Sequence, residues 1–342
     1  GELDLSILTN LTTIEYGAFE GKSDGTTNQI TNIKLSNSTT TIRYRAFAHN
    51  AIDGELNLST LTNLTNLKQE SFCGNEITSI KLPSSVTYID KGTFQSNKLS
   101  GELDLSNTGI TSIGESAFCG SKNGNQITSV KFPVTLVSIG AEAFLGNALS
   151  GELDLSTLTN LTSIGKEVFG STYSDTDNQI TSVKFPNSLE SIGEYAFYGC
   201  SNLSEIVFSK NLINFGDNTM FEGTMWLEKQ MAQNELVIVN GYLVAAGTAT
   251  GKVVIPERVK TIGDWVFSGR EDIEEIVIPT SVEYIGENAF GGTTWLENEK
   301  KKNDLVIVNN IVVNGQNIQV LAGSSIAPSS SKYVLAGQDV IG

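Results

Sequence analysis

The sequence contains little of the chemistry on which histidine catalysis, zinc binding or disulfide cross-linking depends. Its 342 residues include 1 histidine and 3 cysteines. The single histidine, His49, cannot supply a His-rich zinc site or an HExxH motif, and it effectively excludes a histidine-based nucleophilic triad. The cysteines, which are Cys73, Cys119 and Cys200, are odd in number and far apart, and so fit neither a disulfide framework nor a metal-ligand pattern. We therefore expect single buried thiols, no metal and no cofactor.

Basic residues and long apolar runs are also scarce. The 22 Lys and Arg residues are outnumbered by 38 Asp and Glu residues, which leaves a formal net charge of -16. Such acidity disfavours nucleic acid and anionic membrane surfaces as partners, because both attract positive charge. No segment approaches the roughly 18 to 20 apolar residues of a membrane span, so no membrane insertion is expected in this segment. No signal peptide is visible, but the chain begins at Gly1 without Met, so this absence says little about the native precursor.

What the sequence has in abundance is internal repetition. One recurring unit is Ile-Gly-x-x-Ala-Phe, and its clearest copies are residues 113–118, 139–144, 192–197 and 285–290. The other unit is a short segment with apolar residues two apart, and its commonest step is 23 residues, as from Leu35 to Leu58. Each short segment can bury only one face, so we expect successive copies to stack as a parallel sheet, with strands roughly 4.8 Å apart. The phenylalanine of the other unit is predicted to fill the core once per repeat.

These residues carry a resemblance to a known family. Residues 77–94 (ITSIKLPSSVTYIDKGTF) and 273–290 (IEEIVIPTSVEYIGENAF) resemble the BspA-like class of leucine-rich repeats, and the resemblance extends over about residues 1–292. It implies an α/β-type repeat solenoid dominated by short parallel β-strands, a right-handed arc with two inserted helix-hairpin segments. BspA-like proteins include bacterial adhesins that bind extracellular matrix and clotting proteins, so the resemblance also implies a cell-surface binding role.

The repeats alternate in pairs, and the pairing predicts a charge ladder. Copies that begin Gly-Glu-Leu-(Asp/Asn)-Leu-Ser alternate with copies that mostly end in Pro. Outward residues on stacked strands should then lie side by side in a column that reads Asp4, Lys34, Asn57, Lys81, Asp104, Lys131, Asp154 and Lys184. Opposite charges on adjacent strands stabilise the sheet by a few tenths of a kcal/mol each. The column is therefore either a self-neutralising ladder that fixes strand order or a charged recognition face that includes Lys131, Asp154 and Lys184.

Toward the C-terminus the same column becomes apolar, with Val207, Val254 and Val277. An exposed apolar strip is a candidate binding site. The alternative is that an inserted segment covers the strip.

Two insertions interrupt the repeats. Each has a Trp-Leu-Glu stretch, at Trp226 and Trp295, followed by two apolar runs that are joined by Asn-Gly or Asn-Asn. Asn-Gly between apolar β-branched runs indicates a type I′ hairpin. We expect a helix-hairpin at about residues 222–250 within a solenoid of residues 1–292, and a second hairpin with a C-terminal cap or linker in residues 293–342. Each tryptophan either packs its helix onto the solenoid or is an exposed anchor for a partner.

We find no residue set that would support catalysis. Glu102 and Asp104 offer paired carboxylates, but the pair recurs with the repeat, whereas an enzyme needs one asymmetric site. The sequence therefore predicts a non-enzymatic extracellular or cell-surface protein, whose signal peptide and anchor are not in this chain. Its expected partner is a protein ligand, such as a host matrix or cell-surface protein. The alternatives are a carbohydrate-binding or accessory module of a larger secreted protein, with a glycan as partner, and an intracellular scaffold.

Overall fold

The computed structural model describes residues 1–22, 29–171, 178–216, 218–302 and 305–315. The chain forms two compact units, Gly1–Leu227 and Glu228–Gly342, and each is described by itself. Both are built from short, mostly parallel strands, which confirms the predicted repeat solenoid. The predicted C-terminal cap or linker, from residue 316 onward, lies outside the described residues, and the division into residues 1–292 and 293–342 stays a prediction.

The longer strands of the first unit form what we call the long-strand row. The repeat spacing predicted that these strands form one continuous sheet. Instead, they form separate hydrogen-bonded groups of two or three neighbouring strands. The groups are β1 (Glu2–Asp4) with β3 (Asn32–Lys34), β5 (Asp53–Asn57) with β7 (Glu76–Lys81), β9 (Ser100–Asp104) with β11 (Gln126–Lys131), and β13 (Ser150–Asp154) with β15 (Gln179–Lys184) and β17 (Glu205–Val207). Gly54, Gly101 and Gly151 lie in the starts of these strands with φ of 66°, 72° and 74°, and the register shifts beside each of them. A left-handed residue produces a bulge, so these three groups carry the same local irregularity, which the β1–β3 pair lacks.

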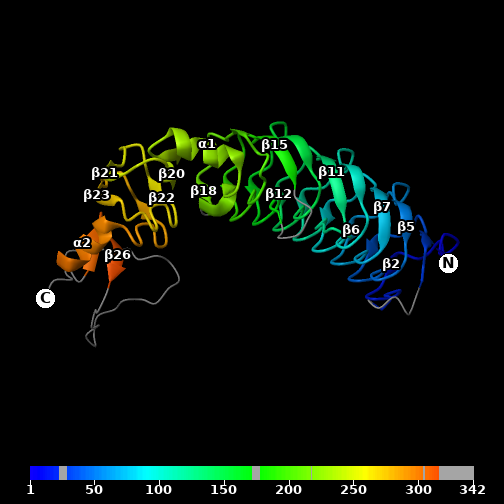
Figure 1. Cartoon of the computed structure of the whole chain (residues 1–342). Helices are drawn as coiled ribbons and strands as arrows, with labels where there is room; N and C mark the ends of the chain where they lie inside the picture. The colour runs from blue at the N-terminus through cyan, green and yellow to red at the C-terminus, as the bar shows by residue number, and fades with distance from the viewer. Residues whose placement is uncertain (23–28, 172–177, 217, 303–304, 316–342) are drawn as a thin grey trace, which may run out of the picture. The chain divides into compact units, whose positions relative to one another are not determined.

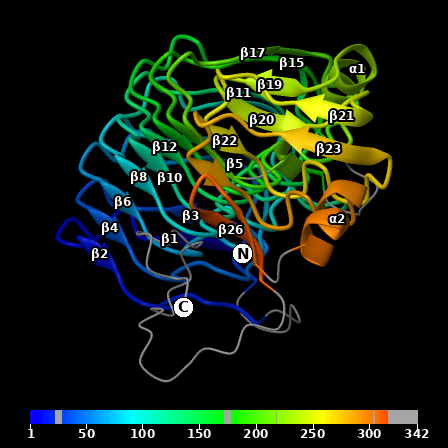
Figure 2. The same cartoon turned by 90° about the vertical axis from the view of Figure 1, so that its left-hand side faces the viewer.

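A second set, the short-strand row, supplies the continuous sheet. It has nine strands of two residues each, in parallel register and in sequence order along the unit. They are β2 (Thr13–Ile14), β4 (Thr41–Ile42), β6 (Asn66–Leu67), β8 (Tyr88–Ile89), β10 (Ser112–Ile113), β12 (Ser138–Ile139), β14 (Ser163–Ile164), β16 (Ser191–Ile192) and β18 (Asn214–Phe215). Figure 1 shows the two rows on different sides of the stacked turns, and Figure 2 shows the same arrangement from the side.

The glycine that follows the short strand allows this close stacking. A Cβ at Gly140 would lie 2.7 Å from the Glu115 nitrogen, and one at Gly193 would lie 2.5 Å from the Gly165 carbonyl carbon. Real side chains do not tolerate such distances, so Ile-Gly in the repeat reflects direct contact between the backbones of adjacent turns. Two residues later the chain turns through a left-handed residue. Non-glycine examples in the first unit are Arg45, Glu70, Ser116, Glu142, Glu167 and Tyr195, with φ between 53° and 57°.

Phenylalanines fill the core once per turn, as predicted. Consecutive rings from Phe19 to Phe221 have centroids 5.3 to 6.0 Å apart. All from Phe47 onward are fully buried. Offset aromatic contacts of this kind add to the stabilisation that burial of the rings provides.

A buried asparagine ladder runs beside the phenylalanine stack. The Asn75 amide donates to the carbonyl oxygens of Phe47 (2.9 Å) and Phe72 (3.1 Å), and its oxygen accepts from the Ile52 nitrogen (3.1 Å). Asn97, Asn125, Asn147 and Asn178 repeat this pattern. Cys200 occupies the equivalent position in the next turn, and its thiol contacts the Phe169 oxygen at 3.1 Å. The ladder ties consecutive turns together by satisfying backbone groups that would otherwise be buried unpaired.

Threonine replaces asparagine where the first insertion begins. The Thr224 hydroxyl donates to the Phe221 oxygen at 2.7 Å and accepts from the Leu227 nitrogen at 3.2 Å. It is therefore the N-cap of α1 (Met225–Gln233), which follows a short 3₁₀ helix, η1 (Asn218–Phe221). Thr293 caps α2 (Thr294–Lys302) through Phe290 and Leu296 in the same way.

The second unit contains both predicted hairpins. They are β19 (Val237–Val239) with β20 (Tyr242–Ala245), and β25 (Leu305–Val308) with β26 (Ile311–Gly315). The turn residues Asn240 and Gly241 have φ of 48° and 81°, and Asn309 and Asn310 have φ of 49° and 65°, as type I′ turns require. β20 then pairs in parallel with β22 (Thr261–Ile262), which pairs with β24 (Tyr284–Ile285). The longer strands β21 (Gly251–Val254) and β23 (Ile273–Val277) form a separate pair.

Candidate binding surfaces

The predicted charge ladder is present, but its ion pairs differ from those expected. Asp104 lies opposite Lys131, and Asp154 lies opposite Lys184, as the repeat register predicted. The lysines nevertheless pair chiefly with the glutamates that lie two residues before these aspartates on the same strands. Lys131 lies 2.7 Å from Glu102, Lys184 contacts Glu152, and Lys184 is 3.9 Å from Asp154. Lys34–Glu2 and Lys81–Glu55 repeat the arrangement, at 2.5 and 2.9 Å.

The aspartates of the column accept hydrogen bonds from serines instead. Asp104 Oδ1 accepts from the Ser106 backbone nitrogen at 2.9 Å and from its hydroxyl at 2.6 Å, which closes the turn after the strand. These hydrogen bonds, more than the charge of Lys131, hold the pKa of Asp104 below its ordinary value of 3.8. Asp4 and Asp154 follow the same scheme with Ser6 and Ser156. The prediction that Asp neutralises Lys was therefore wrong about the partner, because the short Asp side chain is bonded to serine while the longer Glu meets lysine.

The three valines of the predicted strip are exposed, one in the first unit and two in the second. Val207 is 56% exposed, Val254 58% and Val277 40%. In the second unit, Val254 and Val277 lie directly side by side on β21 and β23, next to an ion pair between Lys252 and Glu275 at 2.6 Å. In the first unit, Val207 on β17 lies beside Lys184. The high exposure shows that neither inserted segment covers these three valines, among the residues that the structure describes.

Neither predicted tryptophan anchor is presented to a partner. Trp226 and Trp295 are only 7% and 9% exposed. Trp226 packs edge-on against Phe208 and Phe221 at 5.3 and 5.2 Å, and Trp295 packs against Phe290 at 4.9 Å. The structure thus supports the alternative that each tryptophan packs its helix onto the phenylalanine stack.

One exposed tryptophan, Trp265, was not predicted from the sequence. Trp265 is 49% exposed and has a φ of 60°. It occupies the left-handed position two residues before Phe267, which glycine, glutamate or another residue fills in other turns. Bulky residues seldom adopt this conformation. Alignment of the repeats on their phenylalanines would have singled it out.

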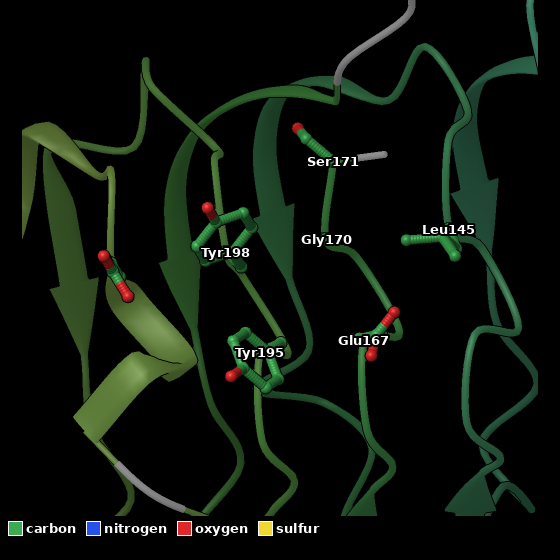
Figure 3. A pocket seen from close by; sticks show the side chains of 7 residues that line it. Leu145, Glu167, Gly170, Ser171, Tyr195 and Tyr198 are labelled. Carbon is green, nitrogen blue, oxygen red and sulfur yellow. The ribbon is translucent and has the colours of Figure 1, made fainter. Parts of the chain in front are cut away.

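Two tyrosine-lined depressions also escaped prediction, because each combines residues from successive turns. The first, of about 410 Å³, is lined by Tyr16, Thr41, Arg43, Tyr44, Lys68, Gln69 and Asp90. The rings of Tyr16 and Tyr44 are 4.6 Å apart. The second, of about 370 Å³, is lined by Leu145, Glu167, Gly170, Ser171, Tyr195, Tyr198 and Glu222 (Figure 3).

Two of the cysteines and the single histidine lie in structural surroundings. Burial raises the pKa of the Cys73 and Cys119 thiols to about 11, so neither forms a thiolate readily. His49 shares a hydrogen bond of 2.8 Å with the Arg45 guanidinium. Within the described residues no group of three or more His, Cys, Asp or Glu side chains could hold a metal ion. No helix there is long and apolar enough to cross a membrane.

Comparison with known proteins agrees with the repeat architecture. The family described as BspA type leucine-rich repeat region matches residues 3–123, 102–176 and 171–297. No curated protein matches the chain.

Several solved structures are similar in fold. A leucine-rich repeat protein from Eubacterium ventriosum is 23% identical, with a TM-score of 0.39, over 64% of this chain and 52% of its own. This chain thus spans about half the length of that protein. A leucine rich cell surface protein from Faecalibacterium prausnitzii is 21% identical, with a TM-score of 0.33, over 83% and 68%. The pneumococcal vaccine antigen PcpA is 15% identical, with a TM-score of 0.41, over 88% and 76%. At these identities and TM-scores, the likeness concerns the repeat fold and not function.

Proposed function

Because the chain belongs to the BspA type leucine-rich repeat family, we propose that it is a non-enzymatic module that binds a protein ligand at a cell surface or outside the cell. The observation that carries the proposal is the pair of exposed valines, Val254 and Val277, on the outward face of β21 and β23. In the first unit, most of the same strand positions bear charged side chains that are already bonded, the lysines to glutamates such as Glu102 and the aspartates to serines such as Ser106. Charges that are already paired offer little to a partner, whereas exposed apolar side chains gain free energy when a partner covers them.

The surroundings of the two valines suit a protein interface. The Lys252–Glu275 ion pair lies next to them in the strand register, so an apolar centre has a polar neighbour. Interfaces commonly combine a small apolar centre with a polar rim. Val207 is a further exposed valine, in the first unit, and the proposed contact does not depend on it.

A glycan partner is the second candidate function, and the stacked pair Tyr16 and Tyr44 favours it. Tyr16 is 68% exposed, and its ring lies 4.6 Å from that of Tyr44. Sugar rings present apolar C–H faces that pack on aromatic rings and hydroxyls that bond to nearby polar groups. Arg43, Gln69 and Asp90 supply such groups in the same depression.

The proposal is tested by binding to immobilised matrix proteins, mucin and intact host cells, with a glycan array in parallel. We expect saturable binding to a protein target, and a loss of at least about tenfold in the Val254→Asp/Val277→Asp variant, because each substitution places a charge at the centre of the contact. Val134→Asp, at an exposed turn position, is the matched control and should bind like the wild type. Circular dichroism should show the fold intact in both variants.

Two results would contradict the proposal. If no target in the panel binds saturably, the protein-binding function fails. If the array gives binding that Tyr16→Ala/Tyr44→Ala abolishes while protein targets give none, the glycan alternative replaces it.

A further inference from the structure

The depression around Tyr195 and Tyr198 is formed by consecutive turns of the first unit. Glu167 follows β14, both tyrosines follow β16, and Glu222 follows η1. Leu145 from the preceding turn, which is 8% exposed, also lines it. Its volume of about 370 Å³ falls within the range of small-ligand pockets. Figure 3 shows the two tyrosine rings one above the other, with Glu167 beside them.

The repeat backbone fixes these side chains in place. Glu167 and Tyr195 both occupy the left-handed position two residues before a core phenylalanine, each with φ of 55°. The Glu167 nitrogen donates to the Glu194 oxygen at 2.9 Å, which ties one turn to the next. The rings of Tyr195 and Tyr198 have centroids 5.5 Å apart and are inclined at 74°, so they form two walls of one corner. Such preorganised walls lose little conformational entropy on binding.

The pocket is negative in character. Glu167 and Glu222 bring two carboxylates to its lining, and the ring faces of the tyrosines are themselves electron-rich. Lys166 lies beside the pocket, with its Nζ 3.4 Å from Glu194 and 3.6 Å from Glu167, so Glu167 is partly neutralised and Glu222 supplies the second lining carboxylate. Lys166 also lies 5.4 Å from the centre of the Tyr195 ring, so a cation already contacts this aromatic group. The depression around Tyr16 and Tyr44 lacks this bias, since Arg43 and Lys68 line it with a single carboxylate, Asp90.

We propose that this pocket receives an exposed lysine or arginine side chain of the protein partner, held between the tyrosine rings and the carboxylates of Glu167 and Glu222. The inference rests on the proposed protein-binding function and specifies the chemistry of one contact. A positive charge near an aromatic face and carboxylates is favourable by both cation–π and ion-pair interactions. The net charge of -16 adds a general attraction for basic partners, so the test must resolve this pocket from the rest of the surface.

The experiment is a nuclear magnetic resonance titration of the whole chain with Nα-acetyl-arginine amide and Nα-acetyl-lysine amide. The ring signals of Tyr195 and Tyr198 should shift saturably at millimolar ligand, while those of Tyr16 and Tyr44 should shift less. Nα-acetyl-citrulline amide, a neutral isostere of the arginine ligand, should shift neither pair. Glu167→Gln and Glu222→Gln should each weaken binding by about twofold to fivefold. The exposed Glu228→Gln removes the same charge elsewhere and should change nothing.

The tyrosine variants complete the test. Tyr195→Phe/Tyr198→Phe keeps the ring faces and should retain binding, whereas Tyr195→Ala/Tyr198→Ala should weaken it at least about tenfold. Equal shifts with the citrulline ligand, unchanged affinity in both glutamine variants, or binding of neutral monosaccharides without binding of the cations would each overturn the inference. The outcome is separate from that for Val254 and Val277. If those valines prove irrelevant while the pocket titrates, only the proposed valine contact fails.

Discussion

One position of the repeat, in the turn that follows the core phenylalanine, is occupied differently in the two units. In the first unit a buried asparagine such as Asn97 occupies this position and bonds to the Phe72 and Phe94 oxygens and to the Ile77 nitrogen. In the second unit the position holds Arg270 and Thr293. Arg270 reaches the carbonyl oxygens of Gly247 and Ala249 and pairs with Asp272. Thr293 bonds to Phe290 and caps α2.

The comparison shows how one side chain decides where the chain goes next. A carboxamide both donates and accepts, so Asn97 can bond to carbonyl oxygens of its own and the preceding turn and also to an amide of the preceding long strand. A threonine hydroxyl has a single proton, which Phe290 receives, and its remaining capacity serves the first amides of a helix. Thr224 at the end of the first unit behaves in the same way. Threonine in place of asparagine therefore marks the two places at which the chain leaves the repeat turns and forms a helix.

The largest loss of stability should follow the substitution of a buried asparagine of the ladder. Asn97→Ala removes the hydrogen bonds to Ile77, Phe72 and Phe94 and leaves these backbone groups buried without that partner, so we expect the free energy of unfolding to fall by about 3 kcal/mol. Urea denaturation followed by circular dichroism measures the change. Asn160→Ala, whose side chain makes an exposed hydrogen bond to Val134, is the control and should cost far less. Similar losses in the two variants would show that the ladder is not a special source of stability.

A smaller loss of stability is expected when the threonines that cap the helices are substituted. Thr224→Ala and Thr293→Ala each remove a helix N-cap, which costs about 1 kcal/mol. Hydrogen exchange should quicken at the amides of Leu227 and Leu296, which lose their acceptor, and stay unchanged in the phenylalanine core. Thr250→Ala, at an exposed loop position, is the matched control. Unaltered exchange at both leucine amides would contradict the capping role.

The smallest effect concerns the charge ladder and its response to acid. The pKa of Asp104 is lowered chiefly by hydrogen bonds from Ser106, so its contribution to stability is present above the ordinary value of 3.8 and is lost as the pH falls through the lower folded value. Ser106→Ala should raise the pKa of Asp104 in a carboxyl titration followed by magnetic resonance. Lys131→Gln should raise it less, because the charge of Lys131 is the weakest of the causes. A larger rise in the lysine variant would restore the originally predicted Asp–Lys ladder.

Much of the fold follows from periodicity, because each repeat buries the same kinds of residue. The phenylalanine stack, the hairpin turn at Asn240 and Gly241, and the register of Asp104 with Lys131 were all predictable from spacing. The ion pairs were not, because which carboxylate a lysine meets depends on side-chain reach and on the competing bond to Ser106. Spacing also predicts alignment of strands but not which neighbours share hydrogen bonds, and so the pairing of the long strands was missed.

The candidate site was less predictable than the fold. Exposure of Val254 and Val277 was one of two outcomes left open, since spacing cannot show where an insertion folds. The burial of Trp226 depends on contact with Phe208 and Phe221, which lie in different parts of one turn. The pocket at Tyr195 needs the left-handed turns of adjacent repeats, a feature with no pattern of residue types.

The spacing between the phenylalanine and its asparagine has a practical consequence. Asn75 bonds to the Phe72 oxygen three residues earlier, Asn125 to that of Phe118 seven residues earlier, and Asn178 to that of Phe169 nine residues earlier. The same hydrogen bond thus forms whether or not extra residues separate the asparagine from the phenylalanine. The phenylalanine stack therefore accommodates insertions at this point of the turn. A foreign peptide grafted between Gly120 and Asn125 would be displayed at a fixed place on an unchanged scaffold, which makes this turn a ready attachment point for engineered epitopes.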